Sequence, residues 1–152
     1  MPFKDYANYE DWKVHFERYI EKVENEVILI GSSLGGIFLM KYLSENIYPK
    51  KIISLYIVGS AFDGTGRKYI AGCFYLPKDL SRVEINCKNI NLLFSVDDDI
   101  VPIFHAEKYK EKLPSASIFK YPDINGHFKI KEFTEIITMI RNDIKNHHQQ
   151  NI

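Results

Sequence analysis

The sequence has little of what marks a disulfide framework, a zinc site, a nucleic-acid-binding surface or a membrane anchor. Its two cysteines, Cys73 and Cys87, lack the paired C-x-x-C spacing of a zinc site. Lys plus Arg and Asp plus Glu both total 20, so no positive surplus is present to hold a nucleic-acid backbone. No segment approaches the roughly 20 apolar residues that cross a bilayer, and the amino-terminal residues contain no apolar signal-peptide core. These features favour a cytoplasmic protein without a nucleic-acid partner, a membrane anchor or a metal.

The sequence does contain enough apolar material for one domain. Of its 152 residues, 45% are hydrophobic and 14% are aromatic, which suffices for a single core but not for two. We therefore expect residues 1–152 to form one domain.

The spacing of apolar residues predicts how the chain begins. Residues 8–25 place apolar side chains at three- and four-residue steps between charged ones, which indicates an amphipathic helix. The unbroken apolar run at 27–30 is typical of a strand covered on both faces of a parallel sheet. After Gly35 and Gly36, residues 37–43 predict a largely buried helix. The order is therefore strand, glycine-rich turn, helix.

The same unit recurs along the chain. Further strands are predicted at 52–58, 90–94 and 116–121, and strands that alternate with helices indicate a parallel α/β sheet of about four strands with right-handed crossovers. Pro102 stands at a plausible first position of the helix after the third strand. The last helix is expected to turn one apolar face inward: Phe133, Ile136, Ile137, Ile140 and Ile144. We expect an irregular cap over 59–88 and a frayed tail from His147 to the end.

A serine motif stands between the first strand and its helix. The segment 31–35 reads Gly-Ser-Ser-Leu-Gly and matches G-x-S-x-G, the nucleophile elbow, with Ser33 as the nucleophile. A strand that turns into a helix within a few residues strains the serine backbone, and side chains two positions to either side are expected to collide with neighbouring backbone. The alternative is that the glycines only allow a helix to start close to a strand, around a phosphate. That alternative is weaker, because the sequence here matches neither the P-loop nor the dinucleotide fingerprint.

A serine nucleophile needs a base, and the base needs an acid to orient it. On a hydrolase sheet the order along the chain is serine, acid, histidine, with the acid and the histidine on loops after later strands. Three aspartates, residues 97–99, follow the third strand, and His127 follows the fourth, just after Gly126. Singly, each has a plain alternative: a surface histidine at a helix start, and a helix cap, for which Asp99 is the candidate. Together, and in this order, they favour a catalytic site.

At these residues the sequence resembles the small serine hydrolases related to the retinoblastoma-binding hydrolase, within the α/β-hydrolase superfamily. The matching segments are 27–36, 58–62, 72–74, 95–102 and 126–128, and the resemblance runs from about Tyr9 to Ile144. It implies a three-layer α/β-hydrolase-like fold and hydrolysis of small carboxylic esters or amides without a cofactor. The family's acid stands fourth in a G-x-x-D-x-x-V-P-like segment, which selects Asp98 over Asp97 and Asp99.

One departure from the family pattern concerns the start of the chain. Family members begin with another strand and a glycine-rich loop that donates one oxyanion-hole N–H, and both are expected to be absent here. The N–H of Leu34 would remain as the oxyanion donor, and loss of one donor typically lowers turnover by about 10²- to 10³-fold. The strand at 27–30 would become a sheet edge, which a second copy of the chain or a separate partner would cover.

The motifs and the missing segment together support two functions. The first is a serine hydrolase in which Ser33 attacks, His127 transfers the proton, Asp98 orients His127 and Leu34 N–H holds the oxyanion. The second is a catalytically weak or silent interaction module that keeps the hydrolase fold. A nucleotide- or phosphate-binding α/β domain is a third, weaker hypothesis.

Overall fold

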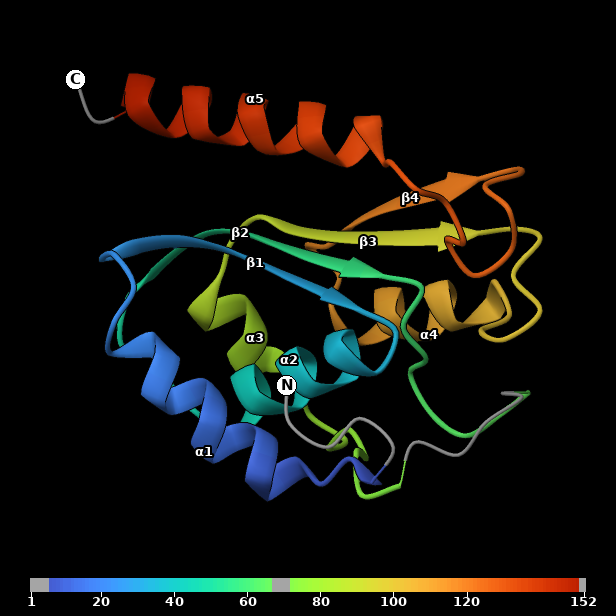
Figure 1. The fold of residues 1–152 in the computed structure, drawn as a ribbon, viewed down its shortest axis with the longest axis horizontal. Helices are drawn as coiled ribbons and strands as arrows, with labels where there is room; N and C mark the ends of the chain where they lie inside the picture. The colour runs from blue at the N-terminus through green and yellow to red at the C-terminus, as the bar shows by residue number, and fades with distance from the viewer. Residues whose placement is uncertain (1–5, 67–71, 151–152) are drawn as a thin grey trace.

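The computed structural model describes residues 6–66 and 72–150, and it has one parallel sheet between two layers of helices (Figure 1). The strands are β1 (Glu26–Ser32), β2 (Lys51–Val58), β3 (Ile90–Ser95) and β4 (Ser117–Tyr121), hydrogen-bonded in the order β1-β2-β3-β4. Every neighbouring pair is parallel. The helices are α1 (Tyr9–Ile20), α2 (Leu34–Glu45), α3 (Ser81–Asn86), α4 (Phe104–Lys112) and α5 (Thr134–Gln150).

The strand order explains the layers. Each new strand joins the same side of the sheet, so right-handed crossovers place all the connecting helices on one face. Figure 1 shows α1, α2, α3 and α4 on that face and α5 alone on the other. The expected three-layer arrangement of an α/β hydrolase, reduced to four strands, is therefore what the described residues form.

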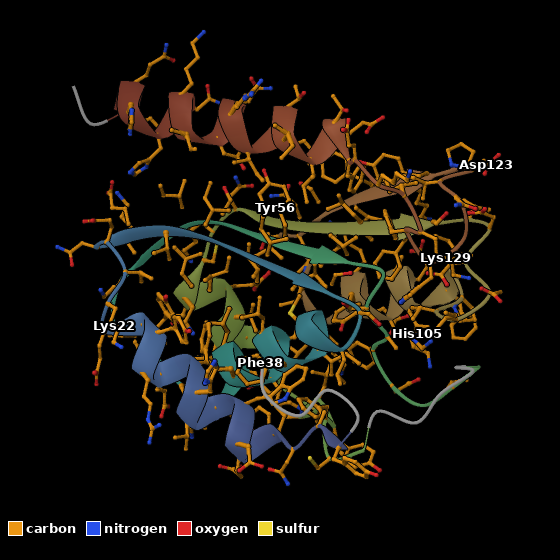
Figure 2. All side chains as sticks on the ribbon, viewed as in Figure 1. Lys22, Phe38, Tyr56, His105, Asp123 and Lys129 are labelled. Carbon is orange, nitrogen blue, oxygen red and sulfur yellow. The ribbon has the colours of Figure 1, made fainter. Side chains whose placement is uncertain are left out.

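Each layer has its own hydrophobic core. The larger core lies between the sheet and the four-helix face, and it contains Phe38, Leu43 and Trp12. The smaller one lies under α5 and contains Tyr56, Leu93 and Ile136. Figure 2 shows Phe38 and Tyr56 on opposite sides of the sheet. All six residues of β3 are buried, because this strand lies inside the sheet and is covered on both faces.

The predicted elements are confirmed, with corrections at their ends. Helix α1 ends at Ile20 rather than near residue 25, and two of the apolar residues in that spacing, Tyr19 and Val23, are exposed. Asn8 caps its start by accepting hydrogen bonds from the N–H groups of Glu10 and Asp11. Helix α4 begins two residues after Pro102.

Strand β1 differs from the prediction of a strand covered on both faces. It is an edge of the described sheet, and the side chain of Ile30 is 50% exposed. The unbroken apolar run is a poor guide here, because burial of an edge strand depends on what lies beside it in space.

Two expectations about less regular regions were also wrong. The connection from 59 to 88 is irregular over 59–66 and 72–80, as expected, but it then forms the helix α3, which packs on α2. The tail does not fray at His147, because α5 continues to Gln150 and His147 is buried. The imidazole of His147 lies 2.8 Å from Glu26 Oε1 and 3.2 Å from Lys51 Nζ, which fastens the end of α5 to the first two strands. Ile137 and Ile144 are exposed, so the inward face of α5 is narrower than predicted.

Candidate active site

The three predicted site residues lie at the carboxyl ends of three strands. Ser33 follows β1, Asp98 follows β3 and His127 follows β4. Because parallel strands end at the same edge of a sheet, these loops meet there. Figure 2 labels Lys129 and Asp123 on the loop after β4, at the edge toward which the strand arrows point.

The structure brings the three side chains into one hydrogen-bonded series. His127 Nδ1 lies 2.6 Å from Asp98 Oδ2, and His127 Nε2 lies 2.9 Å from Ser33 Oγ. A carboxylate oxygen accepts, so the contact with Asp98 assigns the proton to Nδ1, and Nε2 is then the acceptor for the Ser33 hydroxyl. This is the arrangement in which an imidazole can remove the proton of a serine.

The backbone around Ser33 is a strained turn held by hydrogen bonds. Ser33 has φ 51° and ψ −120°, a sparsely populated conformation that typically costs about 1–3 kcal/mol. Its N–H donates to Val58 O at 2.9 Å, and its carbonyl accepts from Ser60 Oγ at 2.8 Å. The end of β2 therefore fixes the serine between β1 and α2.

The glycines of the motif play different parts from those predicted. A Cβ on Gly31 would lie 2.6 Å from the carbonyl oxygen of Gly35, so the expected collision is present there. A Cβ on Gly35 would meet nothing within 4 Å, so the expectation for this position was wrong. The crowded position is Gly36, where a Cβ would lie 1.9 Å from Ser60 Oγ. Helix α2 approaches the end of β2 at Gly36, one residue beyond the motif.

Asp98 is the acid that meets His127, as the resemblance implied. It is 7% exposed, and its Oδ1 accepts from the N–H groups of Ile100 and Val101 at 2.8 and 2.9 Å. Asp98, rather than Asp99, thus caps the turn before α4. The Asp99 carboxylate is exposed, and its Oδ1 lies 4.0 Å from Lys129 Nζ.

The loop that carries His127 has an uncommon backbone. Asn125, Gly126 and Phe128 have φ of 61°, 66° and 52°, so the chain turns sharply on both sides of the histidine. The Asn125 amide donates to Lys129 O at 2.7 Å across the turn. Gly126 N–H donates to Asp97 Oδ2 at 2.8 Å, a contact that no local sequence pattern indicates.

Leu34 stands where an oxyanion donor is expected. It is the first residue of α2, and the first N–H groups of a helix have no acceptor within the helix. The helix dipole also favours negative charge at this end. Ser32 is exposed and precedes the turn, so it does not share the position of the nucleophile.

A small apolar cavity lies beside the elbow. It measures about 90 Å³ and is lined by Ile37, Ala61, Phe62, Asp63, Phe74, Tyr75 and Leu76. Three of these lining residues, Phe62, Phe74 and Tyr75, are aromatic. Two lining residues are tied to the elbow backbone: Ala61 directly follows Ser60, whose hydroxyl donates to the Ser33 carbonyl, and Ile37 N–H donates to the same carbonyl at 3.3 Å.

Other hollows and histidines lie apart from this series. A wider hollow of about 520 Å³ lies at the opposite end of the sheet, between the starts of β2 and β3, α3 and the last turns of α5. His105 is buried and accepts from Phe62 N–H at 3.2 Å, a structural role. His15 packs against Tyr19 on α1.

Among residues 6–66 and 72–150, no group of three or more metal-ligating side chains is gathered. Within the same described part, no helix has the length and apolar character needed to span a membrane.

Comparisons with known proteins agree with this fold. No protein-family model matches the sequence. The chain is 28% identical over 119 residues to serine hydrolase RBBP9 of Rattus norvegicus. The aligned residues make up 78% of this chain and 61% of the relative. It therefore spans less than two thirds of that relative's length.

Solved structures are similar over nearly the whole chain. The ydeN gene product from B. subtilis superposes with a TM-score of 0.84 at 17% identity, covering 95% of this chain and 80% of that one. A carboxylesterase structure from Nitrososphaera gargenis superposes with a TM-score of 0.68 at 14% identity, covering 92% of this chain and 74% of that one. Mouse alpha/beta hydrolase domain-containing protein 10 superposes with a TM-score of 0.62 at 19% identity, covering 98% of this chain and 72% of that one. The chain thus has the α/β-hydrolase fold, and its sequence resembles the small serine hydrolases of the RBBP9 type.

Proposed function

We propose that the protein is a serine hydrolase that cleaves small carboxylic esters, and amides of similar size, through an acyl-enzyme intermediate. The observation that carries the proposal is the series Ser33 Oγ, His127 Nε2 and His127 Nδ1, Asp98 Oδ2, with distances of 2.9 and 2.6 Å. The similarity to a serine hydrolase and to carboxylesterases supports the same reaction class.

In the acylation half, His127 Nε2 takes the Ser33 proton while Oγ attacks the carbonyl carbon of the ester. The negative charge that develops on the carbonyl oxygen lies toward the N-terminus of α2, where the Leu34 N–H donates to it. His127 then gives the proton to the leaving alcohol. In the deacylation half, the same imidazole activates a water that releases the acid and restores Ser33.

Asp98 keeps the imidazole in the required tautomer. Its Oδ2 accepts the Nδ1 proton, which leaves Nε2 as the acceptor that faces the serine. Since Oδ1 is occupied by two backbone N–H groups, the carboxylate cannot rotate without losing them. No step in this scheme calls for a cofactor.

The cavity of about 90 Å³ beside the elbow favours a short acyl group. Its lining is mainly apolar, and its size admits only a few carbon atoms. We therefore propose short-chain acyl esters as the substrate class, with the alcohol portion facing solvent.

Hydrolysis of p-nitrophenyl acetate, butyrate and octanoate tests the proposal. We expect turnover of the two short esters, weaker turnover of the octanoate, and loss of activity in Ser33→Ala. Activity that survives in Ser33→Ala, or a folded protein that is inactive on all three esters, would count against it.

The second candidate function is the interaction module, and the edge strand favours it. β1 leaves one side of its backbone without a neighbour among the described strands, and Ile30 is half exposed beside it. Such an edge pairs readily with another extended strand. The occupant we propose is a second copy of this chain, since a two-fold pairing of β1 with β1 would satisfy both edges at once. Sedimentation of the wild type and of Ile30→Lys tests this: a dimer lost in the variant supports it, and a wild-type monomer contradicts it.

The proposed compartment is the reducing cytoplasm. Cys73 and Cys87 are both free thiols, a state that persists in reducing compartments.

A further inference from the structure

The aspartate next to the proposed catalytic acid joins the two loops of the site. Asp97 directly precedes Asp98 after β3, and its Oδ2 accepts the Gly126 N–H at 2.8 Å from the loop after β4. Its other oxygen, Oδ1, accepts from the hydroxyl of Ser95. Ser95 is the last residue of β3 and is fully buried, so the carboxylate is held from the rigid end of the sheet.

The contact lies one residue before His127. Gly126 has φ 66°, and Asn125 before it and Phe128 after His127 also have positive φ, so the direction of the His127 side chain depends on how this backbone is held. The hydrogen bond from Asn125 Nδ2 to Lys129 O stays within the loop, and the His127 side chain reaches the segment after β3 only through its own bond to Asp98. The Asp97 carboxylate does fix it, from the same strand end that carries Asp98.

We propose that Asp97 is a positioning residue for His127: its carboxylate clamps the Gly126 N–H to the end of β3 and thereby holds the imidazole between Asp98 and Ser33. The inference rests on the proposed function for its kinetic consequence, because a displaced imidazole matters to turnover only if it is the base.

The charge state of Asp97 fits the clamp. The Ser95 hydroxyl and the Gly126 N–H hold the pKa of the Asp97 carboxyl below its usual value. The group is therefore ionised at neutral pH, and hydrogen bonds to a carboxylate are stronger than those between neutral groups.

The geometry separates Asp97 from Asp99, which has the same side chain two residues later. Both carboxylates are exposed, but Asp97 accepts the Gly126 N–H, whereas Asp99 Oδ1 lies 4.0 Å from Lys129 Nζ, a distance at which an exposed ion pair stabilises little. Asp99→Ala is thus a matched control that removes a carboxylate from the same loop without releasing Gly126.

Steady-state ester hydrolysis by three variants tests the clamp. For Asp97→Ala we expect kcat to fall by about 10- to 100-fold with KM unchanged, because a small displacement of a catalytic group has effects of this size. Asp97→Asn should recover most of the loss, since its amide can accept from Gly126 N–H and donate to Ser95 Oγ. Asp99→Ala should match the wild type. Equal rates for Asp97→Ala and Asp99→Ala would overturn the proposal.

A second readout does not depend on turnover. The His127 Nδ1 proton that is hydrogen-bonded to Asp98 should give a downfield imidazole N–H resonance in the proton NMR spectrum of the wild type and of Ser33→Ala. We expect this resonance to be lost through exchange in Asp97→Ala and retained in Asp97→Asn and Asp99→Ala. If it persists unchanged in Asp97→Ala, the clamp is refuted even if the esterase activity is real. An inactive wild type that shows this pattern refutes the proposed function and leaves the clamp supported.

Ser95→Ala guards against a folding defect in Asp97→Ala. It leaves the carboxylate in place but removes the hydroxyl that holds it, so we expect a smaller fall in kcat than in Asp97→Ala. Wild-type kcat in Ser95→Ala, together with an intact resonance in that variant, would contradict the view that the carboxylate is held from β3.

Discussion

The backbone of Gly59 lies against the imidazole ring of His127. A Cβ at Gly59 would lie 3.3 Å from the ring atoms Cε1 and Nδ1, and 3.2 Å from the Phe128 ring. Gly59 is the first residue after β2, has φ 52°, and donates its N–H to Leu93 O at 2.9 Å. The end of β2 therefore forms a flat wall for the histidine that follows β4.

Gly59→Ala is expected to lower both stability and turnover. An alanine in this left-handed conformation costs about 1–2 kcal/mol, which urea unfolding can measure. Its methyl group also pushes on the His127 ring, so kcat for ester hydrolysis should fall. Gly72→Ala is the control: Gly72 has φ 57°, and a Cβ there would be no closer than 3.9 Å to Ala7 O. It should lose similar stability and keep the wild-type kcat. Equal kcat in both variants would show that the contact between Gly59 and the His127 ring has no effect on turnover.

Gly35 and Gly36 should respond to alanine in opposite ways. Gly35→Ala places its methyl group in open space on a helix, where alanine is favoured over glycine by about 0.5–1 kcal/mol. Gly36→Ala forces its methyl group into Ser60 Oγ, and overpacking of this kind typically costs about 1–3 kcal/mol. Thermal unfolding of the two variants gives the comparison. A destabilised Gly35→Ala and a tolerated Gly36→Ala would contradict the packing around the elbow.

Asp98→Asn separates the two jobs of the acid. The amide oxygen can still accept from Ile100 N–H and Val101 N–H, so the turn before α4 should survive. Its NH₂ group would face His127 Nδ1 and favour the wrong tautomer, for which a loss of kcat on the order of 10⁴-fold has precedent in triad enzymes. Steady-state kinetics with circular dichroism checks both effects. A fully active Asp98→Asn would exclude Asp98 as the orienting acid.

The two thiols should differ in reactivity. Burial raises the pKa of the Cys87 thiol to about 11, and the thiolate is the reactive form, so Cys87 should resist iodoacetamide at mildly alkaline pH. Cys73 is exposed and should react in the native protein. Peptide mapping should find both modified after unfolding in guanidinium, and Cys73→Ser should remove the native-state labelling. Fast modification of Cys87 in the folded protein would contradict its burial.

The sequence was informative where local pattern and tertiary environment agree. The strands at 52–58 and 90–94 are interior strands and are apolar except for one polar residue each, Ser54 and Asn91, so a mainly apolar run identified them correctly. The first strand has the same pattern at an edge, where Ile30 is half exposed, and there the pattern misled. A run of apolar residues reports what the strand can bury but not what lies beside it.

The site was predictable in its residues and less so in its supports. Ser33, Asp98 and His127 stand in a motif and an order that carry chemistry, and the structure brings them together. Gly36, Gly59 and Asp97 support them through contacts between residues far apart in the chain, which no local pattern encodes. From the sequence alone, Asp97 is one of three consecutive aspartates that could each be a solvated helix cap. Its bond to the Gly126 N–H is visible only in the structure.

The end of α5 is another place where a contact distant in the sequence decides the structure. His147 looked like part of a polar tail, yet it is buried beside Glu26, 121 residues away. Nothing in the sequence around His147 indicates that Glu26 lies beside it.

Labelling with a fluorophosphonate tests most directly whether Ser33 is an activated nucleophile. Intact mass and peptide mapping should find one adduct, on Ser33, that is absent from Ser33→Ala and strongly slowed in a His127→Ala variant. A folded protein that forms no adduct, or one labelled at another residue, would contradict the catalytic role of Ser33.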